Sequence, residues 1–181
     1  MVNMAANSFL QQIIKQKGIY NPSKIIELLD LEISSLLNNN RSVGQTNDGI
    51  DMGFCRFDIK SRKGHYCGAG RPLYLIRKGE LIEFNKGQNS IGYLAGQKKI
   101  FKSVYFDLRK DDTFYIFSDG YTDQFGGENV KKFNRKRFRT LLTSIHKMPM
   151  DKQEDELRLS FDNWKGKHDQ IDDVCVLGIT I

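Results

Sequence analysis

Residues Phe114-Tyr-Ile-Phe-Ser-Asp-Gly-Tyr-Thr-Asp123 form an apolar and aromatic run that ends abruptly on a serine, an aspartate and a glycine. The first four residues favour β-structure, lack helical spacing and are too continuously apolar for a strand with one face in solvent. The run therefore predicts a buried strand that delivers the carboxylate of Asp119 to a sheet edge, with Gly120 allowing a sharp turn. Carboxylates held in this way bind Mg²⁺ and Mn²⁺, although an Asp-Gly pair is also a common strand-ending turn.

The C-terminal segment, Gln170 to Ile181, favours the metal interpretation. Two adjacent acids, Asp172 and Asp173, stand directly before a second continuous apolar strand. One strand ends on a carboxylate and the other begins after one, so antiparallel neighbours would bring Asp119 and Asp172 or Asp173 to the same edge. Like charges placed this close need a cation between them.

Length and composition predict one soluble domain, because 181 residues with 39% hydrophobic content can build a substantial core. No apolar run is long enough for a membrane span, and no signal-peptide pattern follows Met1, so we expect a cytoplasmic protein. Cys55, Cys67 and Cys175 lack paired spacing. We interpret them as reduced core residues rather than ligands of a zinc site.

The formal charge of +6 arises in one segment, Lys131 to Arg139, which holds six basic residues and no acid. Apolar residues follow at helical spacing from Phe138 to Ile145, so Arg135, Lys136 and Arg139 are predicted to form the solvated face of an amphipathic helix. Such a patch would also steer an anionic substrate. Nucleic-acid binding through this segment is not our prediction, because it lacks a recognised binding motif.

The remaining chain predicts two N-terminal helices, several short strands and two later helices. The helices cover Ser8 to Lys17 and a long stretch after Asn21-Pro22, in which Asp30 is expected on the outer face. Strands at 52–59, 65–69, 73–77 and 81–84 predict a meander, and 104–108 is expected to pair with the strand of residues 114–117. Residues 85–99 suit a surface loop beside the site. With helices at 134–146 and 151–164, the order predicts an α+β layered sandwich of antiparallel sheets.

Five phrases of the sequence, in this order and spacing, resemble the SpoIIE-type bacterial serine/threonine protein phosphatases, a branch of the metal-dependent, type 2C-like PPM family. The likeness covers nearly the whole chain. It implies an α/β/β/α sandwich with a binuclear Mn²⁺ or Mg²⁺ centre between its sheets. It also implies hydrolysis of phosphoserine or phosphothreonine in bacterial signalling, often on an anti-sigma-factor antagonist. The phrases are Asp48-Gly-Ile-Asp-Met52, Cys67-Gly-Ala-Gly-Arg-Pro-Leu-Tyr-Leu75, Ile116-Phe-Ser-Asp-Gly-Tyr-Thr-Asp-Gln124, Trp164-Lys-Gly166 and Gln170-Ile-Asp-Asp-Val174.

The resemblance assigns roles to individual acids. Asp119 matches the metal-binding aspartate of the family's Ser-Asp-Gly motif, and Asp172 matches that of the closing Asp-Asp motif, so both are predicted metal ligands and catalytic residues. Asp173 and Asp123 are further candidate ligands. The family's earlier Gly-Asp strand pair, whose aspartate bridges both metals, has no counterpart here. We therefore expect residues 1–181 to be a single phosphatase domain that is N-terminally incomplete.

Two functions lead at this stage, and nucleic-acid binding through residues 131–139 is a third that ranks below both. The first is a phosphatase that is fully active only with its N-terminal portion supplied. The second is a non-catalytic module of the same fold that binds a phosphoprotein or a regulatory partner, which the missing bridging aspartate favours. Expected partners are a phosphorylated protein and an N-terminal sensor or remaining phosphatase segment, and the sequence leaves open whether two copies form a homodimer.

Overall fold

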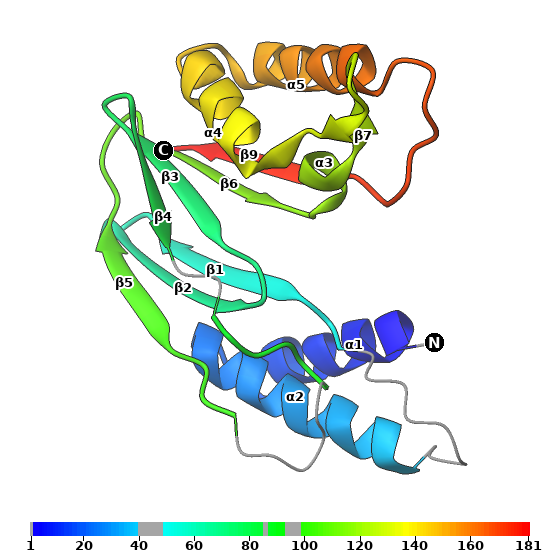
Figure 1. The fold of residues 1–181 in the computed structure, drawn as a ribbon. Coiled ribbons are helices and arrows are strands. Elements are labelled where there is room, and N and C mark those ends of the chain that lie inside the picture. The colour runs from blue at the N-terminus through cyan, green and yellow to red at the C-terminus, as the bar shows by residue number, and fades with distance from the viewer. Residues whose placement is uncertain (1, 40–48, 85–86, 93–98) are drawn as a thin grey trace. The chain divides into compact units, whose positions relative to one another are not determined.

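The computed structural model describes residues 2–39, 49–84, 87–92 and 99–181 (Figure 1). The chain divides into two compact units, the first formed by Met1–Leu73 and Phe84–Leu108 and the second by Tyr74–Glu83 and Arg109–Ile181. Within the described ranges, no helix combines the length and apolar character that crossing a membrane requires. The helices are α1 (Val2–Gln11), the π-helix η1 (Gln12–Gln16), α2 (Pro22–Asn39), α3 (Gly120–Asp123), α4 (Asn134–Ile145) and α5 (Met150–Lys165). The strands are β1 (Met52–Asp58), β2 (Lys63–Ala69), β3 (Leu73–Arg77), β4 (Glu80–Phe84), β5 (Ser103–Asp107), β6 (Thr113–Phe117), β7 (Phe125–Gly126), β8 (Lys131–Lys132) and β9 (Val176–Thr180).

The first unit packs α1 and α2 along one face of a three-stranded antiparallel sheet with the order β1-β2-β5 (Figure 1). The predicted start of α2 is confirmed, because the side-chain oxygen of Asn21 accepts a hydrogen bond from the Lys24 main chain at 3.2 Å. The first helix begins at Val2, earlier than the predicted Ser8, and continues as η1. Gly18, with φ at 63°, follows the end of η1. An apolar stripe on these helices forms the core with β2, through Ile13, Ile25, Ile26, Leu29, Ile33, Cys67 and Ala69.

Asp30 is buried, so the expectation that it lies on the outer face of its helix is wrong. Its Oδ1 accepts hydrogen bonds from the main-chain nitrogen of Gly92 at 2.8 Å and from Nζ of Lys99 at 2.6 Å. The carboxylate thereby ties part of the predicted 85–99 loop to α2. Residues 85–86 and 93–98 of that loop lie outside the described part of the chain.

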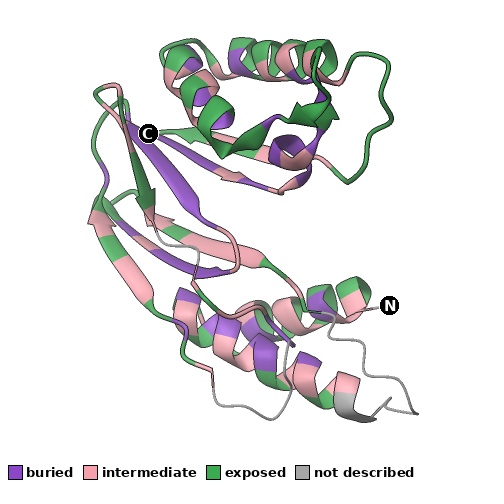
Figure 2. Cartoon of the chain, in the orientation of Figure 1, coloured by how far each residue is buried: buried purple, intermediate pink, exposed green. Residues whose placement is uncertain are grey.

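The second unit contains a four-stranded sheet with the order β4-β3-β6-β9, and α4 and α5 lie over one face of it (Figures 1 and 2). The predicted pairing of the two apolar runs is confirmed, since β6 and β9 are antiparallel neighbours with Phe117 opposite Val176. Aromatic rings fill the space between this sheet and the helices; the centroids of Tyr121 and Phe138, for example, lie 4.7 Å apart. The buried members of this core are Tyr74, Ile76, Tyr115, Phe117, Tyr121, Phe133, Phe138, Leu142 and Phe161.

The predicted meander of residues 52–84 forms two hairpins instead, β1–β2 and β3–β4, because β2 and β3 belong to different sheets. The β3–β4 hairpin turns on Lys78 and Gly79, both with positive φ, as a tight two-residue connection requires. However, β5 pairs with β2 in the first unit and not with β6. The intervening turn is held in the second unit by Asp112, whose carboxylate accepts two hydrogen bonds from Arg77 at 2.8 and 2.7 Å. The expected pairing of β5 with β6 is therefore wrong, although the two strands are adjacent in the sequence.

Within the basic segment, Lys131–Lys132 forms β8 and residues 134–139 begin α4, in which Phe138 and Leu142 are buried and Arg135 and Lys136 are exposed as predicted. Arg139 is not simply solvated: its Nε donates to the Tyr74 hydroxyl at 3.1 Å, and it forms an ion pair with Glu83.

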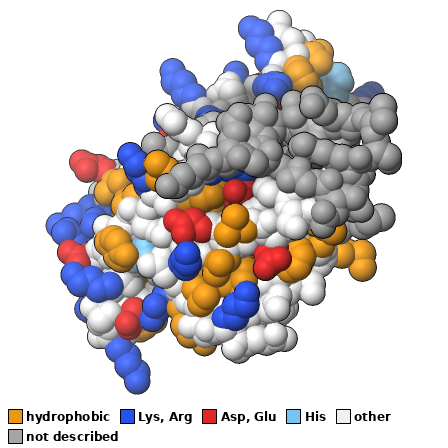
Figure 3. Space-filling model, turned by 90° about the horizontal axis from the view of Figure 1, so that it is seen from below, with side chains coloured by type: hydrophobic (Ala, Val, Ile, Leu, Met, Phe, Trp, Pro, Cys, Tyr) orange, Lys and Arg blue, Asp and Glu red, His pale blue; other side chains and the backbone are white. Residues whose placement is uncertain are grey.

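On the face seen in Figure 3, the described Lys and Arg side chains are interspersed with acidic and hydrophobic ones, so this face presents mixed charge.

The three cysteines are free, but they are not equally buried. Cys67 lies in the core of the first unit, Cys55 is half-buried, and Cys175 is exposed directly before β9. The prediction of a core position is therefore correct for Cys67 and wrong for Cys175.

Candidate metal centre

The two acidic segments meet where β6 ends and β9 begins. β6 is followed by Ser118 and Asp119, and β9 is preceded by residues 166–175, here called the closing loop. The main-chain nitrogen of Ser118 donates to the Cys175 carbonyl at 2.9 Å, which continues the β6–β9 ladder by one step. The expected juxtaposition of the two segments at one sheet edge is thus present in the backbone.

Ser118 and Gly120 join these two segments. The Ser118 hydroxyl donates to the main-chain oxygen of Asp173 at 2.8 Å and accepts a hydrogen bond from the Cys175 nitrogen at 2.9 Å. A Cβ atom on Gly120 would overlap the same Asp173 carbonyl and would lie 3.3 Å from the carbonyl oxygen of Asp172. Position 120 therefore requires glycine, because the closing loop passes over it at van der Waals distance.

Asp119 and Asp172 occupy the two sides of this joint. Asp119 is half-buried and begins α3, with its main-chain oxygen accepting from the Asp123 nitrogen at 2.8 Å; its side chain makes no capping hydrogen bond to that helix. Asp172 is exposed, and its Oδ1 accepts from the Asp173 nitrogen at 2.8 Å, which orients the carboxylate. Asp173 contributes its main-chain oxygen to the joint.

Asp123 has a different partner. Its carboxylate forms an ion pair with Nζ of Lys132 at 2.9 Å, linking α3 to β8. Among the described residues, no group of three His, Cys, Asp or Glu side chains lies close enough together to hold a metal ion. Asp119 and Asp172 carry hard oxygen donors, the type that Mg²⁺ and Mn²⁺ prefer, on two segments that the joint brings together, and two carboxylates would supply only part of a coordination shell.

Gln124 is a residue of this region to which sequence reasoning assigned no role. Its side chain is fully buried, and its Nε2 donates to the carbonyl oxygens of Phe125 at 3.0 Å and Asp169 at 2.9 Å. Its Oε1 accepts from the main-chain nitrogen of Ile171 at 3.4 Å. The partners on the closing loop are main-chain atoms more than forty positions along the chain, so no local pattern in the sequence indicates them.

Trp164 and Gly166 connect α5 to the same region. The indole Nε1 of Trp164 donates to the main-chain oxygen of Gln124 at 3.1 Å, and Gly166, with φ at 55°, ends the helix and starts the closing loop. These contacts explain the Trp164-Lys-Gly166 phrase: Trp164 fixes the end of α5 at Gln124, and Gly166 begins the closing loop there.

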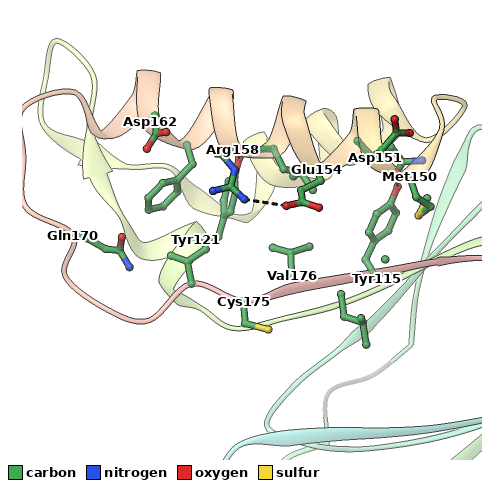
Figure 4. Close-up of a pocket in the computed structure, with 16 residues that line it drawn as sticks. Tyr115, Tyr121, Met150, Asp151, Glu154, Arg158, Asp162, Gln170, Cys175 and Val176 are labelled. Atoms are coloured by element: carbon green, nitrogen blue, oxygen red, sulfur yellow. Dashed lines mark hydrogen bonds and ion pairs between the residues drawn. The ribbon is translucent and has the colours of Figure 1, made fainter.

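A groove of about 740 Å³ lies between α5 and β9, beside the candidate centre (Figure 4). Glu154 and Arg158 form an ion pair across its rim at 2.9 Å. Burial raises the pKa of Tyr121 to about 12, so this phenol stays protonated and donates to the Leu157 carbonyl at 2.7 Å. Gln170 and Cys175 line the groove, whereas Asp119 and Asp172 are not among its lining residues. The groove is therefore a neighbour of the acids and not their site.

Comparisons with known proteins give one family from a sequence model and one fold from solved structures. The SpoIIE family model, described as Stage II sporulation protein E, matches residues 1–181. The SiaA-PP2C domain of Pseudomonas aeruginosa superposes with a TM-score of 0.87 at 25% identity, over 99% of this chain and 69% of that one. The PP2C phosphatase domain of Bacillus subtilis SpoIIE, solved with a fragment of its regulatory domain, gives 0.70 at 16% identity, over 97% and 48%.

A third structure, the catalytic domain of the serine/threonine protein phosphatase PstP in complex with two manganese ions, gives a TM-score of 0.63 at 12% identity, over 97% of this chain and 78% of that one. No curated protein matches the sequence. Because the family model spans the full sequence, and the mixed helices and antiparallel sheets match PP2C-type domains, the predicted family and fold class are confirmed. The chain belongs to the SpoIIE family and has the fold of the PP2C-type phosphatase domains.

Proposed function

We propose that this protein is a metal-dependent phosphoserine and phosphothreonine protein phosphatase of the SpoIIE type, with Asp119 and Asp172 as metal ligands. The main support is the joint at Ser118 and Gly120, which brings the two acidic segments together at one sheet edge. Family membership supports the reaction class, and the two manganese ions in PstP support Mn²⁺ or Mg²⁺ as the cofactor. We further propose a cytoplasmic location and, as substrate, a phosphorylated anti-sigma-factor antagonist.

The residues of this chain would divide the work as follows. A divalent cation bound here would acidify a bound water and neutralise phosphoryl oxygens. Asp119 would hold it from the end of β6 and Asp172 from the closing loop, while the main-chain joint keeps the two segments at a fixed separation. Asp173 is a further candidate ligand, and Asp123 would have to exchange Lys132 for the metal. The exposed Arg135 and Lys136 would speed the approach of an acidic phosphoprotein.

The proposal is tested by removing each carboxylate and measuring Mn²⁺ affinity by calorimetry. Asp119→Asn and Asp172→Asn should each weaken binding by about 10-fold or more, equivalent to about 1.4 kcal/mol. Asp155→Asn is the matched control, because Asp155 is an exposed acid of α5 that pairs with Lys152 at 3.0 Å and lies outside the joint. Unchanged affinity in both site variants would overturn the proposed ligands.

A second candidate function is a non-catalytic module of the same fold that binds a phosphoprotein. The observation that favours it is the donor set, since among the described residues no three His, Cys, Asp or Glu side chains lie close enough together to hold a metal ion. A phosphoserine peptide incubated with protein and Mn²⁺ separates the two. Release of inorganic phosphate that is lost in Asp172→Asn supports the phosphatase, whereas saturable peptide binding without release supports the binding module.

A further inference from the structure

We infer that Gln124 is a positioning residue that fixes Asp172 opposite Asp119, an inference that rests on the proposed function. The closing loop is attached at two points to the segment that carries Asp119. Ser118 holds its C-terminal part at Asp173 and Cys175, and Gln124 holds its N-terminal part at Asp169 and Ile171. Asp172 lies between these two attachments.

The amide of Gln124 suits this position in only one orientation. The NH₂ group meets the carbonyl oxygens of Phe125 and Asp169, and the side-chain oxygen meets the Ile171 N–H. Both donors and the acceptor are therefore used, and a flipped amide would set its oxygen against two carbonyls. Glutamate lacks the donors, and an apolar side chain would remove all three hydrogen bonds to the main-chain groups of Phe125, Asp169 and Ile171.

The main chain of Gln124 is itself fixed by three segments. Its nitrogen donates to the Gly120 carbonyl at 3.2 Å, and its oxygen accepts from the Phe133 nitrogen at 2.9 Å and from Trp164 Nε1 at 3.1 Å. The anchor is thus tied to α3, to the start of α4 and to the end of α5. A displacement of the loop relative to Asp119 would have to break the side-chain hydrogen bonds of Gln124 first.

Burial holds the closing loop only near its C-terminal end, where the half-buried Val174 packs against the core of the second unit, because residues 166–173 are exposed. Within this stretch, Gly166 and His168 bond back to the end of α5, and Gln170 Nε2 donates locally to the Asp172 carbonyl at 2.9 Å. An exposed segment gains order from hydrogen bonds to fixed groups, so its position depends on the attachments at Ser118 and Gln124. Catalytic and metal-binding groups need placement to within a fraction of an ångström, so an exposed loop that carries one needs attachments of this kind.

Gln153 provides a matched control for substitution of Gln124. It is also buried in the second unit, and its Nε2 also donates to two main-chain carbonyls, those of His146 at 3.3 Å and Met148 at 2.8 Å. Its oxygen accepts from the Tyr115 hydroxyl. None of these partners belongs to the closing loop, so Gln153→Met should reproduce the general cost of losing a buried amide without releasing Asp172.

The test compares Gln124→Met with Gln153→Met in three measurements: the urea midpoint, amide hydrogen exchange, and Mn²⁺ affinity. Both variants should lower the urea midpoint. Gln124→Met should speed exchange in residues 169–173 by about 10-fold or more, since exchange reports local opening, and Gln153→Met should not. Mn²⁺ affinity should fall by about 10-fold in Gln124→Met and stay near wild type in Gln153→Met.

A double-substitution cycle identifies the residue through which Gln124 acts. In the Asp172→Asn background, Gln124→Met should cause little further loss of Mn²⁺ affinity, because the carboxylate that it positions is gone. Fully additive losses, or equal losses in Gln153→Met, would overturn the inference while leaving the proposed site intact. If wild-type Mn²⁺ affinity is indifferent to Asp119→Asn and Asp172→Asn, the proposed function fails, and Gln124 is then a structural anchor only.

Discussion

Each unit of the protein contains a joint in which a glycine lies against a segment that carries an aspartate, but the joints use different atoms. In the first unit, a Cβ on Gly70 would overlap the carboxylate of Asp51. In the second unit, a Cβ on Gly120 would overlap the main-chain carbonyl of Asp173. One contact is made to a side chain and the other to the backbone.

The difference separates structural acids from candidate functional ones. Asp51 accepts a hydrogen bond from the Ser90 hydroxyl and lies 4.0 Å from Arg71, and Asp30 is paired with Lys99. Asp51 and Asp30 of the first unit thus hold loops through cations and hydroxyls of the protein. In the second unit, main-chain atoms and Ser118 make the joint, so the carboxylate of Asp172 is not needed to hold the segments together. This arrangement suits a group that receives its cation from solution.

Removing one carboxylate charge in each unit should give the largest difference between the units in the free energy of unfolding. Asp30→Asn should lower the free energy of unfolding by about 3 kcal/mol, because Lys99 is then left buried beside a neutral partner. Asp172→Asn should change it by less than about 0.5 kcal/mol, as expected for an exposed side chain. Urea unfolding of both variants measures the difference. Similar losses in the two would show that Asp172 is also structural.

Crowding the second joint should have the next largest effect. Gly120→Ala places a methyl group against a carbonyl that cannot rotate away, so we expect a loss of about 2 kcal/mol and displacement of the closing loop. Gly178→Ala, on β9 of the same sheet, is the control, because its nearest neighbours are the Tyr115 ring and the Met150 sulfur at 3.3 to 3.4 Å. Equal urea midpoints for the two alanine variants would contradict the close approach at position 120.

The corresponding change in the first joint should cost less. Gly70 has a positive φ of 81°, so Gly70→Ala should lower the free energy of unfolding by about 1 kcal/mol through backbone strain. The Asp51 side chain can rotate away from the new methyl group, so the steric cost should be small. Combining Gly70→Ala with Asp51→Ala separates the two contributions. The steric part should disappear in the double variant and the backbone part should remain, whereas complete recovery of the urea midpoint would show that φ strain is absent.

The sequence predicted the elements that carry the candidate site because continuous apolar runs and turn residues are local signals. The β6–β9 pairing followed from two such runs, each bounded by an acid at one end. The errors concern partners far along the chain. Asp30 was misplaced because helical periodicity does not show that Lys99, sixty-nine positions later, will pair with it. The β5–β6 pair was wrong because β5 pairs with β2, a strand far along the chain that no local pattern indicates.

The sequence indicated the candidate ligands of the site, but not the residue that holds the closing loop in place. Asp119 and Asp172 stand out as carboxylates at strand ends, and their role as metal ligands stays a prediction. Gln124 is a polar residue after a short helix, and its importance lies in main-chain partners at Asp169 and Ile171 that a sequence pattern does not specify. Supports of this kind become visible only in three dimensions.

The smallest predicted effect is a dependence of stability on pH that arises in the first unit at His65. Burial lowers the pKa of His65 below its ordinary value of 6.5, and the charge of its cross-strand neighbour Arg56 lowers it further. The ring stacks on Tyr105 at 4.0 Å, and no described residue gives Nε2 a hydrogen bond. The unfolded chain therefore takes up a proton at a higher pH than the folded chain does.

Above pH 6.5 His65 is neutral in both the folded and the unfolded chain, so it does not change the free energy of unfolding with pH. As the pH falls below 6.5, the unfolded chain is protonated first and the free energy of unfolding declines, until the folded form is protonated too. His65→Phe keeps the stacking and removes the proton, so its urea midpoint should fall less between about pH 7.5 and about pH 5 than that of the wild type. His168→Phe, at an exposed position of the closing loop, should retain the wild-type slope. If the urea midpoints of His65→Phe and the wild type change with pH in parallel, His65 has the same pKa in the folded and unfolded chains, and this prediction is wrong.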